Sequence, residues 1–405
     1  MNTKTQIWID RRIVKPFVSG TNIFVRLLGQ LLRLNHSLDI NFKTIAVCKY
    51  KGLGSIVQAT PLLQTLRKKY PDARIVFIST KGNKGLLEKI DCIDETVLLD
   101  DSGFAKLALS YPGFVAKLIS LRIGLFIDLE IYSNFSSLST TLSMARNRIG
   151  FYLRASHYRM GVYTHMMYYN TSVPIMQTYL QMARLLGTPE NEVVTSLYPF
   201  KTTDADSIEI PHLGKYIAIN INASDLRIER RWPLDQFERL VRAFRERYPE
   251  YHIVLIGAKN EADYVTQFHE RFDDLHISSV AGKTTFNQLM SVLDHAELLI
   301  TNDTGPLHLA ASLGKPTVAL FGPCAPVQYG AMDKVVPVYK ELYCSPCVHE
   351  FDIPPCLGDN QCMKQIGTEQ VMKAVEQAMT GDFAAPKKAI PFYSDASKAL
   401  GEVGR

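Results

Sequence analysis

The segment of the chain best suited to chemistry runs from residue 301 to residue 323, TNDTGPLHLAASLGKPTVALFGP. Its pattern predicts a strand, a tight turn and a helix that starts at a proline, where the missing N–H costs nothing. Backbone N–H groups at a helix start, together with the helix dipole, bind phosphate groups. We therefore predict a diphosphate site; an ordinary turn capped by Asp303 is the alternative. The residues of the predicted site are Asp303, Thr304, Gly305, Pro306 and His308.

Four cysteines lie in one loop, residues 344–362, with the spacing C-x2-C-x8-C-x5-C. Four thiolates suit tetrahedral zinc or iron, and the loop has no helix or strand pattern. No coordination position would stay open, so such a metal would be structural, and we expect no cofactor for catalysis. A cysteine-rich loop without metal is the alternative, because a second C-x2-C pair is absent. The four residues are Cys344, Cys347, Cys356 and Cys362.

A basic amphipathic helix is predicted within residues 1–40. Its apolar residues share one stripe, and basic and polar residues flank or oppose it. The stripe would either pack on the protein itself or dock on an anionic membrane surface. The stripe consists of Ile23, Phe24, Leu27, Leu28, Leu31 and Leu32, and the polar residues are Arg11, Arg12, Lys15, Arg26, Gln30 and Arg33.

Length and composition limit the class of protein. A chain of 405 residues is too long for one typical core and sufficient for two domains. The net charge of +5 is mild and basic residues are interleaved with acidic ones, so we expect no nucleic-acid partner. Seven cysteines, no signal-peptide pattern and no long apolar run are typical of a cytoplasmic protein with reduced thiols. It would be peripheral on the inner membrane if the N-terminal helix docks there.

Two runs of alternating strand and helix patterns predict two parallel α/β units. In the first, strands are expected at 44–50, 74–80, 95–100 and 125–130, and a helix at 56–70. In the second, strands are expected at 216–222, 252–258, 298–303 and 316–322, and helices at 234–248, 261–272, 286–295 and 306–313. Ligands of such sheets bind beyond the carboxyl ends of the strands. The loops there are the places to seek a site.

The boundaries follow from these patterns. We predict an N-terminal segment at 1–40, a first Rossmann-like domain at 41–190, a linker at 191–214, a second domain at 215–380 and a tail at 381–405. The polar, proline-containing sequence around the linker supports this division. Two such domains facing each other would enclose a cleft.

Four segments in order resemble glycosyltransferase family 9, the ADP-heptose:lipopolysaccharide heptosyltransferases. They are KGLGSIVQATPLLQTLRKKYPDA from Lys51, RRWPLDQFERL from Arg230, AGKTTFNQLMSVLDHAELLITND from Ala281, and the segment from residue 301 described above. The resemblance covers most of the chain from Thr44 to Met379. It implies a GT-B fold, in which the first domain holds the acceptor and the second a nucleotide-diphosphate sugar, and inverting, metal-independent transfer.

The resemblance also implies roles for single residues. Arg230 would neutralise the charge that grows on the leaving nucleotide, and Glu261 would accept hydrogen bonds from a ribose or be a solvated acid at a helix start. The remaining implied donor contacts are Ser224, Gly282, Lys283 and Thr284, together with the diphosphate residues named above.

The first loop departs from the family. Where lipopolysaccharide heptosyltransferases have a Gly-Asp pair whose acid is taken as the base, this chain has Gly54 and Ser55. A serine hydroxyl does not take a proton unaided at neutral pH. We expect Glu130, or else Asp128, to replace the base; binding of acceptor hydroxyls or helix capping is the alternative for both. Lys51 would meet an acidic or phosphorylated acceptor or stay solvated.

The function expected from the resemblance is transfer of a sugar, heptose from ADP-heptose as the first choice, to a lipopolysaccharide core or a related bacterial surface glycan. The partners would be the nucleotide sugar and a glycan or glycolipid acceptor. Two alternatives stay open: a nucleotide-sugar epimerase of the same fold, and a catalytically silent donor-binding protein.

Overall fold

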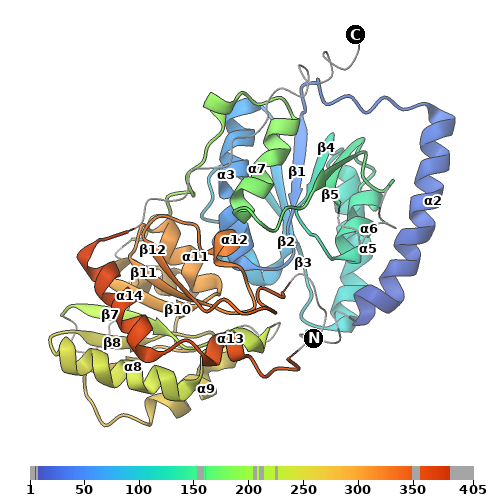
Figure 1. Ribbon diagram of the computed structural model, residues 1–405. Coiled ribbons are helices and arrows are strands. Elements are labelled where there is room, and N and C mark those ends of the chain that lie inside the picture. The colour runs from blue at the N-terminus through green and yellow to red at the C-terminus, as the bar shows by residue number, and fades with distance from the viewer. Residues whose placement is uncertain are drawn as a thin grey trace.

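The computed structural model describes residues 5, 8–152, 159, 161–203, 208, 214–223, 227–348 and 356–383. These residues form two α/β domains, each built around one sheet of six parallel strands. Figure 1 shows the first domain beside the second, with helices on both faces of each sheet.

The strands of the first sheet are β1 Thr44–Cys48, β2 Arg74–Thr80, β3 Glu95–Leu99, β4 Leu125–Asp128, β5 Asn147–Tyr152 and β6 His165–Tyr168. Those of the second are β7 Tyr216–Asn220, β8 His252–Leu255, β9 Ile277–Ser279, β10 Leu298–Asn302, β11 Thr317–Phe321 and β12 Val335–Tyr339. The orders are β3-β2-β1-β4-β5-β6 and β12-β11-β10-β7-β8-β9. Both sheets therefore have the doubly wound order of a Rossmann fold, and the predicted fold class is confirmed.

The helices of the first domain are α2 Lys15–Leu32, α3 Leu53–Lys69, α4 Lys84–Leu87, α5 Phe104–Ser120, α6 Asn134–Leu142 and α7 Ile175–Leu185. Those of the second are α8 Leu234–Arg247, α9 Ala262–His269, α10 Phe286–His295, α11 Gly305–Ser312, α12 Pro326–Tyr329, α13 Gln361–Lys364 and α14 Thr368–Thr380. Short helical turns lie at Asp10–Val14, Lys81–Asn83, Glu190–Glu192, Ile228–Arg230 and Lys259–Glu261.

The two domains share one continuous apolar core. Leu62 and Leu66 of α3 belong to the same core as Met290 of α10 and Leu309 of α11. Burial of each such side chain contributes about 1.5–3 kcal/mol. Helices α3 and α11 contact each other, and Figure 1 shows them where the two domains meet. Packing therefore sets how the carboxyl ends of the two sheets face each other.

Several predicted boundaries were wrong by a few residues. The helix expected from Ile56 begins at Leu53, so Gly54 and Ser55 lie in the first turn of α3 and not in a loop. The helix expected from Pro306 begins at Gly305, with Thr304 as its N-cap. The strand expected to reach Glu130 ends at Asp128. Each shift moves a predicted site residue to a different position on its element.

Candidate active site at the domain interface

The strand order of each sheet marks where a ligand should bind. The order reverses between β1 and β4 in the first sheet and between β7 and β10 in the second. Ligands of doubly wound sheets bind outside the carboxyl ends of the strands at such a reversal. The residues that follow these strands are 49–51, 129–131, 221–223 and 303–304, and the predicted site residues Lys51, Glu130, Asp303 and Thr304 lie in these segments.

The start of α11 offers free backbone donors. Thr304 is the N-cap, and its side chain makes no capping hydrogen bond to the helix. The Thr304 hydroxyl instead accepts a hydrogen bond from the Asn220 amide at 2.9 Å. Among the described residues, the N-cap side chain satisfies none of the first N–H groups of α11, and Thr304 instead holds β10 against β7.

Arg230 and Asp303 lie side by side at this helix start. The Arg230 guanidinium donates to the Asp303 carbonyl at 3.3 Å, and its Nη1 is 3.6 Å from the Asp303 carboxylate. Within the described part of the chain, the buried Nε of Arg230 and Oδ2 of Asp303 have no hydrogen-bond partner. Buried charged atoms without partners are costly. A ligand with both donors and anionic oxygens would satisfy them.

Three asparagines that the sequence reading missed build the walls of this site. Asn302 accepts from the Trp232 N–H at 3.1 Å and donates to the carbonyls that follow β7. Asn222 donates to the Ile256 carbonyl at 3.2 Å, and Asn220 holds Thr304. All three amides are buried. They tie together the strand ends on which the ligand-binding segments are built.

The structure describes most of the residues that were predicted to contact the donor outside its diphosphate. One carboxylate oxygen of Glu261 accepts from the Ala258 N–H at 2.8 Å, so this acid at a helix start makes a local contact with the backbone. Gly282 has φ +71°, and a Cβ there would contact Ala262 at 2.9 Å. The Lys283 ammonium donates to the Ser279 carbonyl, and Thr284 is half-buried nearby. Ser224 lies outside the described residues.

His308 crosses the interface between the domains. Its Nδ1 is 3.1 Å from the Gln58 amide nitrogen of α3, and its ring lies against Gly54, where a Cβ would come within 2.0 Å of it. Burial lowers the pKa of His308 to about 4, so the ring is neutral at neutral pH. Because Gln58 donates to Nδ1, the ring proton lies on Nε2. His308 is thus a neutral N–H donor between the two predicted sites.

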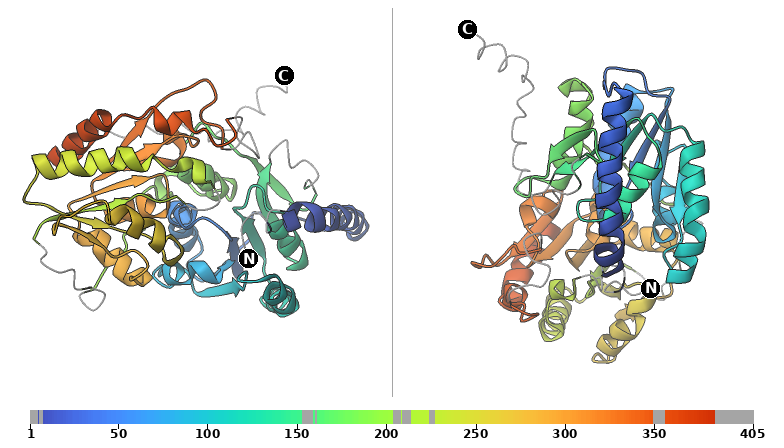
Figure 2. Two further views of the ribbon diagram at one scale, coloured as in Figure 1. Left: turned by 90° about the horizontal axis from the view of Figure 1, so that it is seen from below. Right: turned by 90° about the vertical axis from the view of Figure 1, so that its right-hand side faces the viewer.

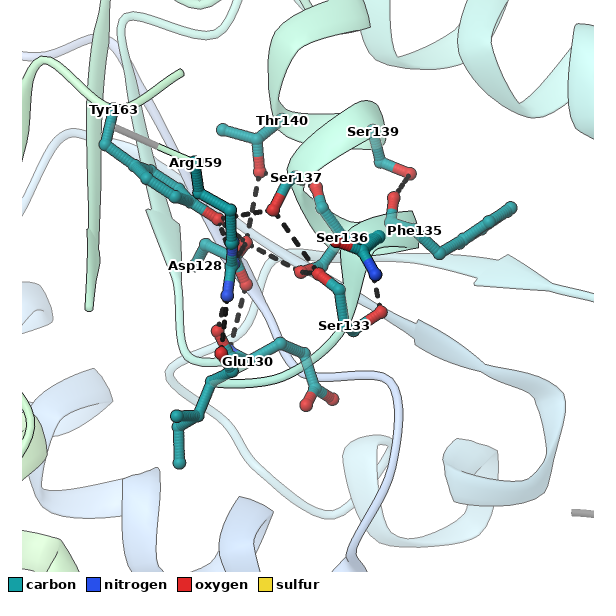
Figure 3. Close-up of polar contacts among 12 residues, drawn as sticks. Asp128, Glu130, Ser133, Phe135, Ser136, Ser137, Ser139, Thr140, Arg159 and Tyr163 are labelled. Atoms are coloured by element: carbon teal, nitrogen blue, oxygen red, sulfur yellow. Dashed lines mark hydrogen bonds and ion pairs between the residues drawn. The ribbon is translucent and has the colours of Figure 1, made fainter. Parts of the chain in front are cut away.

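Asp128 is sealed inside the first domain (Figure 3). Its side chain and that of Arg159 are both 0% exposed and 3.5 Å apart. The Tyr163 hydroxyl donates to Asp128 Oδ2 at 2.5 Å and the Ser136 hydroxyl at 2.8 Å. The Glu130 N–H donates to Oδ1 at 2.9 Å. The geometry therefore favours a positioning role for Asp128, since no acceptor hydroxyl can reach it.

Glu130, two residues on, faces the first loop. Lys49 donates to its Oε2 at 2.8 Å, and the N–H groups of Tyr50 and Lys51 donate to its Oε1 at 2.8 and 3.0 Å. Burial alone would raise the pKa of Glu130, but the Lys49 ammonium and these hydrogen bonds outweigh it and the pKa is lowered. Glu130 is thus an ionised carboxylate, and within the described residues its Oε2 accepts a hydrogen bond from Lys49 alone. Burial lowers the pKa of Lys51, against the pull of Asp101 and Glu130.

Ser55 is half-buried in the first turn of α3 and lies near the buried Tyr179 of α7, within the first domain. Nearby, the Gln328 amide of α12 donates to the Tyr169 hydroxyl of the first domain at 2.9 Å. The Gln328–Tyr169 and Gln58–His308 pairs connect the two domains with polar groups as well as apolar ones.

The predicted metal centre is not formed. Among the described residues, no group of three or more His, Cys, Asp or Glu side chains is arranged to hold a metal ion. Cys362 packs in the apolar core of the second domain, and burial with the neighbouring thiols raises its pKa to about 11. Burial also raises the pKa of Cys347. Both thiols are therefore protonated at neutral pH, while Cys344 and Cys356 are half-buried.

Comparison with known proteins identifies the family of the chain. The family model for glycosyltransferase family 9 (heptosyltransferase) matches residues 132–357, more than half of the chain. A Campylobacter jejuni protein named lipooligosaccharide heptosyltransferase 2 is 23% identical over 337 residues, 80% of this chain and 94% of that protein.

Solved structures show the same fold. A family 9 glycosyltransferase from Veillonella parvula superposes with a TM-score of 0.69 at 20% identity, over 85% of this chain and 99% of that one. The Escherichia coli ADP-heptose LPS heptosyltransferase II does so with a TM-score of 0.67 at 18% identity, over 84% and 100%. With its two doubly wound sheets and its family match, this chain belongs to glycosyltransferase family 9 and is a glycosyltransferase of GT-B fold.

Proposed function

We propose that the enzyme transfers a heptose from ADP-heptose to the core of a lipopolysaccharide or a related bacterial surface glycan, with inversion and without a catalytic metal. The names of its relatives support this choice of donor and acceptor. The observation that supports the donor half is the Arg230–Asp303 ion pair beside the uncapped start of α11, in which the buried atoms Arg230 Nε and Asp303 Oδ2 have no hydrogen-bond partner among the described residues.

The donor diphosphate would lie on the first N–H groups of α11, within reach of the Arg230 guanidinium. Negative charge accumulates on the leaving diphosphate as the glycosidic bond breaks, and a fixed cation and helix dipole stabilise it most at that moment. A bound metal supplies this charge in other transferases, so Arg230 supports metal-independent transfer. The four-cysteine loop has no part in this scheme.

His308 would donate from Nε2 to an oxygen of the donor. It lies against Gly54 and accepts from Gln58, so its position depends on how α3 and α11 meet. This arrangement would couple donor binding on the second domain to the acceptor side of the first.

Thermal shift tests the donor half directly. A donor at about 100 times its Kd adds about 2.7 kcal/mol of stability. We expect ADP-heptose to raise the Tm of the enzyme more than ADP, and UDP- and GDP-sugars to have little effect. A screen in which UDP-sugars stabilise the enzyme and ADP-heptose does not would contradict the choice of donor.

The acceptor hydroxyl needs a proton acceptor, and we propose Glu130. It follows β4 at the strand-order reversal of the first sheet, its Oε2 accepts one hydrogen bond from the part of the chain that the structure describes, and Asp128 is inaccessible. Ser55 and Lys51 would bind the acceptor, the lysine through an acidic or phosphorylated group. The reaction would take place at the cytoplasmic face of the inner membrane, where a lipid-linked acceptor is found.

Replacing Glu130 with glutamine should lower kcat about 10²–10⁴-fold, the usual contribution of a general base. Glutamine still accepts the N–H groups of Tyr50 and Lys51 through its amide oxygen, so we expect the KM values to change little. Because the pKa of Glu130 is lowered, the wild-type kcat should not fall on account of this base between about pH 5 and 8. Near-normal turnover of Glu130→Gln would remove Glu130 from the catalytic role.

A further inference from the structure

The N-terminal helix α2 is oriented in an unusual way. Val18 on one face is fully buried and Val14 nearly so, and both pack against Val162 and Tyr163 of the first domain. A helix on a protein surface ordinarily turns its apolar stripe toward the core. In α2 the contact face is narrow and the main apolar stripe lies elsewhere.

The stripe points outward. Ile23, Phe24, Leu27 and Leu31 are 63%, 64%, 62% and 79% exposed. Large apolar side chains gathered on one exposed face mark an interaction surface. Of the two alternatives, packing of this stripe on the protein itself does not fit these exposed fractions, because periodicity defines the stripe but not the side on which the protein lies. Phe17, Leu28 and Leu32 extend the same surface and are 64%, 38% and 54% exposed.

The charge around this stripe has one sign. From residue 11 to residue 38 the chain has five basic residues and no acidic one. Arg12, Lys15 and Arg33 among them are exposed. A helix that combines an outward apolar stripe with flanking cations matches the interface of an anionic bilayer, where the stripe enters the acyl boundary and the cations meet the headgroups.

Helix α5 lies on the same side of the molecule as α2 and also has exposed apolar residues. Both α2 and α5 pack on α6, and Figure 2 shows them running along one side of the first domain. Phe104, Leu109 and Ile119 of α5 are 56%, 82% and 44% exposed. Residues 102–127 also contain no acidic residue. The apolar, acid-free surface is therefore wider than one helix.

This surface is fixed relative to the acceptor side of the enzyme. The Asp10 carboxylate, just before α2, accepts hydrogen bonds from the N–H groups of Asn134 and Phe135 at 3.0 and 2.8 Å. These residues start α6, a few residues after Glu130. The N-terminal segment is thus attached to the element that follows the proposed base, and it is not a loose tether.

We propose that α2, extended by the exposed face of α5, is a docking surface for an anionic phospholipid bilayer. The helix would lie in the plane of the interface over about 27 Å, its full length. Within the described residues no helix is both long and apolar enough to span a bilayer. Docking in this orientation brings the first domain to a lipid-linked acceptor. The proposal rests on the proposed function only for the nature of that acceptor.

Vesicle binding tests the proposal. The full chain should sediment with phosphatidylglycerol-containing vesicles and much less with pure phosphatidylcholine vesicles. The triple variant Phe24→Glu/Leu27→Glu/Leu31→Glu should reduce binding at least about 10-fold, since it places three acids in the stripe. A charge-matched control, Leu275→Glu/Tyr343→Glu/Leu357→Glu, changes residues that are also highly exposed. The control should bind as the wild type does.

Failure of the docking surface can be distinguished from failure of the proposed function. The triple variant should keep its Tm and its transfer to a water-soluble core oligosaccharide, and lose transfer to the same acceptor anchored in vesicles. If the wild type does not bind anionic vesicles, or if the triple variant binds them as well as the wild type does, the proposal is wrong. A wild-type dimer that the triple variant dissociates, with no vesicle binding, would assign the surface to a second copy of the chain instead.

Discussion

Replacing Arg230 with alanine should lower kcat about 10²–10³-fold, the usual effect of removing one donor that stabilises transition-state charge. The guanidinium lies beside Asp303 at the start of α11, and its Nε has no partner within the described chain. Its charge matters most as the diphosphate leaves, so the loss should be larger in kcat than in the affinity for the donor. Steady-state kinetics with both substrates varied measures it.

Two variants sharpen this prediction. Arg230→Lys keeps the charge but loses the planar fork, so it should recover only part of the activity. Arg242→Ala removes an exposed arginine of α8 that pairs with Glu238 on the surface. This variant should behave as the wild type. An Arg230→Ala enzyme with unchanged kcat would show that the leaving charge is stabilised elsewhere.

Replacing Asp128 with alanine should lower the free energy of unfolding by about 3–5 kcal/mol, because it leaves the charge of Arg159 buried without its partner. Both side chains are fully buried, and the same carboxylate holds Tyr163 and Ser136 (Figure 3). Any loss of activity should follow the loss of folded enzyme. Urea unfolding and thermal melting measure the change.

Asp235→Ala is the matched control for this prediction. Its carboxylate also pairs with an arginine, Arg271, but is 79% exposed, so the Tm should stay near that of the wild type. A stable Asp128→Ala enzyme that has lost its turnover would contradict the positioning role and make Asp128 the proton acceptor.

The strand, turn and helix of the proposed donor side could be predicted from the sequence because their signals are local. The run 301–323 contains a strand, a turn and a helix start in one stretch, and the structure has all three in that order. The buried runs of β1, β2, β8 and β10 were recognised for the same reason. Strands β5, β6, β9 and β12 were not identified individually, because β9 has only three residues, β5 and β6 contain polar residues, and β12 contains Pro337.

The acceptor side could not be predicted to the same depth, because its contacts are distant in sequence. Asp128 and Glu130 are two residues apart at the end of the same predicted strand, so the sequence pattern does not distinguish their roles. Only the fold separates them, by pairing Asp128 with Arg159 and Glu130 with Lys49. Likewise, no spacing in the sequence predicts the contact between Gln58 and His308, which are 250 residues apart. The four cysteines show the reverse error, since a suggestive spacing did not produce a metal-binding group in the described residues.

The most direct test of the account is one transfer reaction. Purified enzyme, treated with EDTA, would be given ADP-heptose and a core oligosaccharide, and the product analysed by mass spectrometry and by NMR of the new anomeric centre. We predict one heptose added, the opposite anomeric configuration to that of the donor, and a rate that EDTA does not reduce. No transfer from ADP-heptose while another nucleotide sugar is used, retained configuration, or a rate restored only by added metal would contradict the account.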